Sequence, residues 1–69
     1  MIVTMVRAGH YVVTDEGRLA GRVTGDFVIG FRAVLPDGAE LREVFDEPED
    51  AALVLVELTR DDADAGQVG

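Results

Sequence analysis

The sequence predicts an α+β domain, with a small antiparallel sheet of three or four strands and one C-terminal helix packed on it. Three observations lead to this fold class. Short β-prone segments alternate apolar and polar residues over much of residues 1–45. A Pro-Asp-Gly run at 36–38 is typical of a tight turn between two strands. An acidic segment then precedes an apolar stretch with helical spacing that reaches Leu58.

The first part of the chain is predicted to form three short strands. Met1–Val6 is apolar and β-prone, and we expect it at a sheet edge or exchanged between subunits. His10–Asp15 and Leu19–Thr24 follow, joined by a turn in which Gly17 takes a positive φ. By alternation, the side chains expected on the apolar face are Tyr11, Val13, Leu19, Gly21 and Val23.

Phe27–Leu35 and Ala39–Phe45 are predicted to form the central hairpin. Proline presets the first central position of its turn, and glycine supplies the positive φ that a bulged hairpin needs. Alternation directs the following side chains to the core: Phe27, Ile29, Phe31, Ala33, Leu35, Ala39, Leu41 and Phe45. The other face is mixed and mostly polar, so one face should be covered and one should meet water.

Residues 47–59 are predicted to form the covering helix. Asp46 is a candidate cap, Glu49 stands at capping-box spacing, and Pro48 falls in the first turn, where its missing N–H is tolerated. The acidic residues after Arg60 oppose the helix dipole, so we expect the helix to end there. The alternative is a strand over 53–58, because that stretch is almost continuously apolar.

Length and composition indicate one small domain over residues 1–60, with 61–69 as a disordered acidic tail. The chain has 69 residues, no cysteine and a formal net charge of −8. This charge argues against non-specific binding to nucleic acid and to anionic membranes. We find no apolar run long enough to span a membrane and no signal peptide, so a cytoplasmic protein is expected.

No residue pattern predicts a reaction centre, and we expect no enzymatic activity, no cofactor and no metal. His10 is the only histidine, and serine and cysteine are absent. The acidic clusters at 46–50 and 61–64 lack the glycine and terminal glutamate of a calcium loop. They are better explained as a helix start and a solvated tail.

Charge is instead predicted to be distributed in two opposed regions. If the strand phases are right, four arginines lie on the sheet face opposite the helix: Arg18, Arg22, Arg32 and Arg42. The acids at the helix start form the second region: Glu47, Glu49 and Asp50. These seven residues are the candidate interaction surface. The arginines could pair with acids such as Glu40 across strands, or they could contact phosphates or an acidic protein.

Two resemblances concern this pattern of strands and helix. The Gly-Arg-Leu-Ala-Gly-Arg-Val run at 17–23, Pro-Asp-Gly at 36–38 and the Glu-Asp-Ala-Ala start at 49–52 resemble many short proteins of actinobacteria and their phages. The order is also similar to the sheet-plus-helix plan of AP2-like and integrase arm-binding domains, which implies DNA recognition by the sheet. Gly-His-Tyr-Val at 9–12 resembles small SH3-like barrels of the KOW type, which would need 53–58 as the closing strand.

The predicted function is a small acidic interaction or regulatory module that binds a protein partner or itself. One alternative is DNA binding by the arginines of the sheet, although AP2-like domains are basic and this chain has no lysine. Another is an acidic inhibitor that imitates nucleic acid and occupies a basic site on a host protein.

Overall fold

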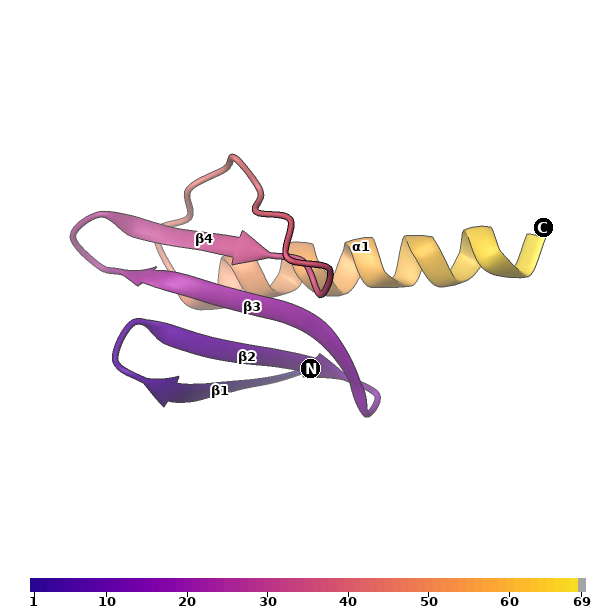
Figure 1. Cartoon of the computed structure of the whole chain (residues 1–69), viewed down its shortest axis with the longest axis horizontal. Coiled ribbons are helices and arrows are strands. Elements are labelled where there is room, and N and C mark those ends of the chain that lie inside the picture. Colours follow the sequence, from indigo (N-terminus) through magenta and orange to yellow (C-terminus); the bar gives the residue numbers. More distant parts are fainter. Residues whose placement is uncertain (69) are drawn as a thin grey trace.

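A computed structural model describes the backbone of residues 1–68 and the side chains of residues 1–60. The elements in chain order are β1 (Ile2–Arg7), β2 (His10–Asp15), β3 (Arg18–Asp26), β4 (Gly30–Val34) and α1 (Pro48–Val68). The four strands form one antiparallel sheet in the order β1-β2-β3-β4, and α1 packs against it (Figure 1). The predicted α+β fold class is confirmed.

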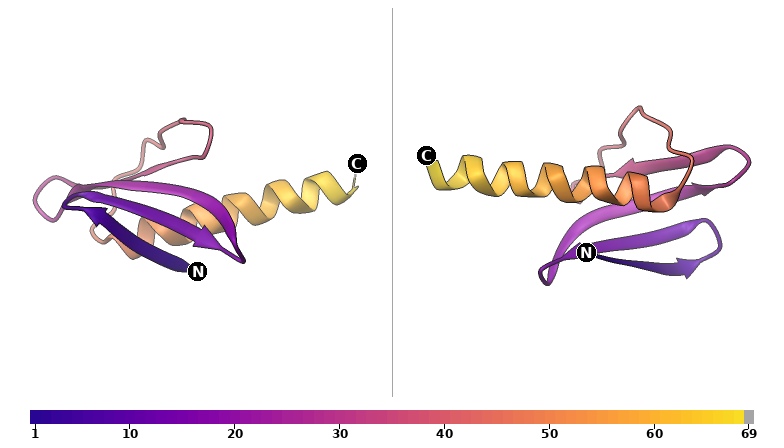
Figure 2. Two further views of the ribbon diagram at one scale, coloured as in Figure 1. Left: turned by 60° about the horizontal axis from the view of Figure 1, so that its bottom comes forward. Right: turned by 180° about the vertical axis from the view of Figure 1, so that it is seen from behind.

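The core lies between α1 and one face of the sheet. Its fully buried members on the strands are Val13, Ala20, Val23, Phe31 and Ala33, and those on the helix are Ala51, Ala52, Leu55 and Val56. Two further views show that α1 covers this face and that no element of the described chain lies over the other (Figure 2). We call the uncovered side the open face.

A bulge in β3 changes the predicted strand phase. Val13 pairs with Gly21 and Thr14 pairs with Leu19, so Ala20 is an extra residue opposite β2. Ala20 is therefore buried, whereas Leu19 is exposed, and the prediction that placed Leu19 in the core and Ala20 outside it is wrong. Glycine is required at position 21, where a Cβ would meet the Leu55 side chain of α1 at 2.8 Å.

The strand predicted over 27–35 is too long. β4 begins at Gly30, and residues 27–29 form the tip of the β3–β4 hairpin. Phe27 and Ile29, predicted to be core residues, are exposed there, while Phe31 and Ala33 are buried as predicted. Gly30 has a φ of 91°, which ends the turn and explains why regular pairing starts at that residue.

The turn at 36–38 is confirmed, but the segment after it does not form a regular strand. The Gly38 amide donates to the Leu35 carbonyl (2.9 Å), and the chain returns antiparallel beside β4. It makes only two isolated bridges, Val34 with Glu40 and Phe31 with Phe45. Between these two bridges β4 spans three residue intervals, from Phe31 to Val34, whereas the returning segment spans five, from Glu40 to Phe45. The extra residues bulge outward and interrupt the ladder.

Residues 53–58 are helical, so the barrel alternative is excluded and the predicted helix is confirmed. α1 begins at Pro48 and continues past Arg60, where the sequence predicts its end, to Val68. The disordered tail predicted for 61–69 lies outside the residues whose side chains are described, and it stays a prediction. Nowhere in the described chain is a helix both long and apolar enough to cross a membrane.

Candidate interaction surfaces

Strand register arranges the open face in rows that cross the sheet. One row consists, in strand order, of Arg7, His10, Thr24 and Arg32. The next consists of Thr4, Val12, Arg22 and Val34. Neighbouring strands lie about 4.8 Å apart, so a four-residue row spans roughly 14 Å. No acidic residue belongs to either row, although the whole chain carries a net charge of −8.

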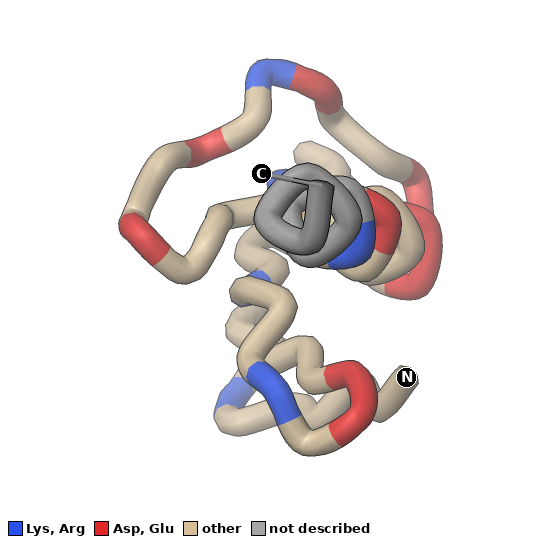
Figure 3. The backbone as a smooth tube through the Cα atoms, turned by 90° about the vertical axis from the view of Figure 1, so that its right-hand side faces the viewer, with Lys and Arg blue, Asp and Glu red and all other residues tan. Residues whose placement is uncertain are grey.

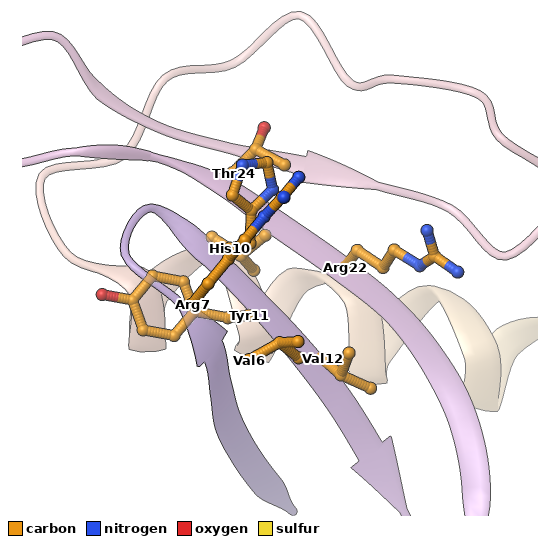
Figure 4. Close-up of a pocket in the computed structure, with 8 residues that line it drawn as sticks. Val6, Arg7, His10, Tyr11, Val12, Arg22 and Thr24 are labelled. Atoms are coloured by element: carbon orange, nitrogen blue, oxygen red, sulfur yellow. The ribbon is translucent and has the colours of Figure 1, made fainter.

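A hollow of about 350 Å³ lies between these rows. Its lining residues are Val6, Arg7, His10, Tyr11, Val12, Arg22, Val23 and Thr24. In Figure 4 the Arg7 side chain extends toward His10 and Thr24, whereas Arg22 points away from them. The charged ends therefore do not converge on one point in this conformation. The surface suits an extended anionic ligand better than a single small anion.

The structure separates the four arginines that the sequence placed together. Arg22 and Arg32 lie on strands of the open face, as predicted. Arg18 pairs with Asp15 before the bulge, so the alternation places it on the helix side of the sheet, and that prediction is wrong. Arg42 lies in the outward bulge after β4 and belongs to no strand. Sequence analysis missed Arg7, because β1 was predicted to end at Val6.

Cross-strand pairing with acids is confirmed for one arginine. The guanidinium Nη1 of Arg32 lies 3.3 Å from the Glu40 carboxylate Oε1. Both side chains are about half exposed, so the pair contributes only about 0–1 kcal/mol. Arg32 is thus partly neutralised, whereas no ion pair is found within the described residues for Arg7 or Arg22.

The acidic candidates gather at one end of the molecule. Glu47, Glu49 and Asp50 are exposed at the start of α1. Figure 3 shows acidic residues recurring along the segment between β4 and α1 and at the helix start. Glu47, and not the predicted Asp46, directly precedes the first helical residue. Across the described residues, no group of three or more His, Asp or Glu side chains could hold a metal ion.

The β3–β4 tip is an exposed apolar surface, although the sequence predicts two of its residues, Phe27 and Ile29, to lie in the core. Phe27 is 75% exposed, Val28 92% and Ile29 73%. Val44, in the bulge after β4, is 51% exposed and lies against Gly30, which extends the surface. We call these four residues the apolar tip. Contiguous exposed apolar patches of this kind mark interaction sites more often than chance placement does.

Local hydrogen bonds hold the apolar tip in one conformation. The Asp26 carboxylate oxygen Oδ1 accepts from the amides of Val28 and Ile29, each at 2.8 Å. The Phe27 ring packs edge-on against Phe31, with centroids 4.9 Å apart. The signal for this turn is present in the sequence, because Asp26 and Gly30 are turn-forming residues that bracket the apolar triplet.

Two backbone hydrogen bonds connect the apolar tip to the acidic end. The Phe31 amide donates to the Phe45 carbonyl, and the Phe45 amide donates to the Phe31 carbonyl, both at 2.8 Å. Phe27 packs edge-on against Phe31, and Asp46 and Glu47 follow Phe45 in the chain. The apolar tip and the acids at the helix start are therefore neighbours.

Comparisons with known proteins add no relative: no family model, no curated protein and no solved structure matches this chain. The resemblances to short actinobacterial and phage proteins and to DNA-binding sheets stay expectations.

Proposed function

We propose that the protein is a non-enzymatic interaction module that binds a protein partner through the apolar tip. The observation that carries this function is the ordered exposure of Phe27, Val28 and Ile29 at the end of the sheet. Phe27 packs against the buried Phe31, whereas Val28 and Ile29 are 92% and 73% exposed and contribute little to the core. A partner that buries them would gain most of their transfer free energy.

The free energy gained by burying the apolar tip is large enough to favour a specific contact. Full burial of a large apolar side chain is worth about 1.5–3 kcal/mol. Because Asp26 already orders the two tip amides, binding loses less conformational entropy than it would with a flexible loop. Interface energy concentrates in a few central residues. Val28, the most exposed of the three, is expected to be such a residue.

The surroundings indicate what the partner looks like. Asp46 and Glu47 follow Phe45, which is hydrogen-bonded to Phe31 beneath Phe27 of the tip, and Glu49 and Asp50 come next in the first turn of α1. A partner that accepts the tip therefore needs an apolar pocket with basic residues on its rim. Such complementarity mainly raises the association rate and the specificity, and salt weakens it.

A pull-down from the source cell lysate with matched variants tests this function. Val28→Ser combined with Ile29→Ser removes apolar surface without touching the core, so the melting temperature should stay within a few degrees. Retained partner should fall at least about tenfold, since 1.4 kcal/mol corresponds to that factor. Leu53→Ala is the control, because Leu53 is 51% exposed on α1 and far from the tip in sequence. Equal retention by wild type and the double variant would refute the proposal.

The open face supports a second candidate function, which is DNA binding by the sheet. Arg7, His10 and Arg22 line one hollow to which no acid contributes. Filter binding with duplex DNA at low and moderate salt tests this function. Arg22→Glu with Arg32→Glu should abolish the retention while leaving the fold intact, because both side chains are exposed. This candidate function would be refuted if the double variant retained as much DNA as wild type, or if wild type retained no DNA at low salt.

A further inference from the structure

We infer that β1 is the interface for a second copy of this chain, paired antiparallel so that two four-stranded sheets form one of eight strands. The starting observation is an asymmetry between the two sheet edges. The outer edge of β4 is covered, since the Leu41 amide donates to the Ala33 carbonyl (2.9 Å) and the Phe31–Phe45 bridge occupies the other end. β1 is the other edge, and no described segment pairs with its outer side.

The side chains of β1 are also unprotected. Ile2 is 64% exposed, Met5 61% and Val6 64%. The strand has no proline and no acidic residue, and its single charge is Arg7 at the C-terminal end. An edge strand of this composition lacks the features that normally block pairing with another chain. Unpaired backbone groups and apolar side chains thus coincide on the same six-residue strand.

Register limits how two copies of β1 can pair. Residues directly opposite each other in an antiparallel pair of strands point to the same face of the sheet. An open-face residue of one copy must therefore lie opposite an open-face residue of the other copy. Ile2 and Thr4 belong to the open face because they pair with Thr14 and Val12. Val6 lines the hollow on that face. Val3, which packs against the core, belongs to the helix side, and so by alternation does Met5.

One register satisfies this condition and pairs the whole apolar segment. With Thr4 opposite Thr4 of the second copy, Ile2 lies opposite Val6 and Val3 lies opposite Met5. Every exposed apolar side chain of β1 then meets an apolar side chain across the two-fold axis. In this register Arg7 falls opposite Met1 of the second copy, whose N-terminal ammonium is already paired with the Asp15 carboxylate at 3.3 Å. The strand is therefore complementary to itself, which is the requirement for a two-fold interface.

The size of the contact sets the expected strength. The five paired residues of each copy, at about 3.3 Å each, give a contact roughly 16 Å long. The area that one short strand buries is small compared with that of most specific interfaces. We therefore expect a reversible dimer. Each copy carries a net charge of −8, so the copies repel one another at low ionic strength. Because residues 2–6 are uncharged and salt screens the repulsion between the copies, the dimer should strengthen as ionic strength rises from about 0.01 to about 0.15 M.

Sedimentation equilibrium of the purified protein tests the inference, at concentrations from about 10 µM to about 1 mM. Wild type should pass from monomer to dimer over this range. Thr4→Lys and Thr4→Glu should each weaken the dimer at least tenfold, because like charges then face each other at the two-fold axis. An equimolar mixture of the two variants should restore it, since the charges are then opposite.

Thr24→Glu is the matched control. It places the same substitution on the open face, but on the central strand β3, between two paired strands. Its dimerisation should equal that of wild type, and circular dichroism should confirm that all variants remain folded. A wild-type monomer at every concentration would overturn the inference. So would a dimer that Thr4→Glu leaves intact, or one that dissociates as salt is added.

Discussion

Gly21→Ala should be strongly destabilising, because an added Cβ at this residue has no room between Val34 of β4 and Leu55 of α1. A Cβ at position 21 would stand 2.8 Å and 3.1 Å from the two Leu55 methyl carbons, and it would clash with the Val34 carbonyl oxygen. A Cβ essentially never lies within 3.0 Å of such neighbours, so the Leu55 side chain would have to shift and the Val34 carbonyl would force the backbone of β3 or β4 to move. The φ of 148° at Gly21 adds a backbone cost for alanine.

The steric cost and the backbone cost of Gly21→Ala can each be given a magnitude. Overpacking a well-packed core costs about 1–3 kcal/mol. A backbone conformation that is essentially reserved for glycine costs about 1–3 kcal/mol more. A domain of this length is stable by roughly 3–10 kcal/mol in total, at about 0.05–0.15 kcal/mol per residue. Gly21→Ala should therefore remove a large share of the stability, and in a weakly stable domain it should prevent folding.

Urea unfolding followed by far-ultraviolet circular dichroism measures this loss. Gly17→Ala is the matched control, because Gly17 has a φ of 77° but no atom within 4 Å of the added Cβ. The control carries a backbone cost alone, so the two variants should differ by at least about 1 kcal/mol, the overpacking term. If Gly21→Ala cost no more than Gly17→Ala, α1 would not lie against β3 at this point.

Three further predictions concern individual contacts. Leu55→Ala should lower the free energy of unfolding by about 2–5 kcal/mol in the same urea titration, because Leu55 is fully buried; a loss below 1 kcal/mol would contradict this burial. Glu40→Ala should change it by less than about 1 kcal/mol, since the pair with Arg32 is exposed, and a larger loss would indicate a buried network. Asp26→Ala should speed hydrogen exchange of the two tip amides, measured by NMR, because it removes their common acceptor. Unchanged exchange would show that other contacts order the tip.

Elements with clear local signals, such as turn residues and helix-start residues, could be predicted from the sequence. β2 has its predicted bounds, because the β-prone residues Tyr11 to Thr14 are bracketed by turn residues, Gly9 before them and Gly17 after them. The helix was predictable because Pro48 and the acids before Ala51 give a start signal that β-propensity in the following residues does not override. The turn at 36–38 was predictable because proline and glycine leave the backbone few alternatives.

The remaining features depend on tertiary contacts that no local pattern encodes. The bulge at Ala20 shifts the phase of β3, and Gly21 beside it leaves no room for a Cβ between the Val34 carbonyl and the Leu55 side chain. That shift is why Arg18 and Arg22 are on different faces. Phe27 and Ile29 continue the apolar alternation of β4, so alternation alone predicts that their side chains lie in the core. The turn formed by Asp26 and Gly30 takes precedence, and it creates the apolar tip.

The most direct test of the proposed function is photo-crosslinking from position 28 in the source cells. A photoreactive residue at Val28 should give one discrete adduct with another protein, and the same residue at Leu53 should not. Excess wild-type protein should suppress the adduct, whereas excess Val28→Ser with Ile29→Ser should leave it. Adducts that are the same from both positions, or that both competitors suppress equally, would contradict a binding site at the apolar tip.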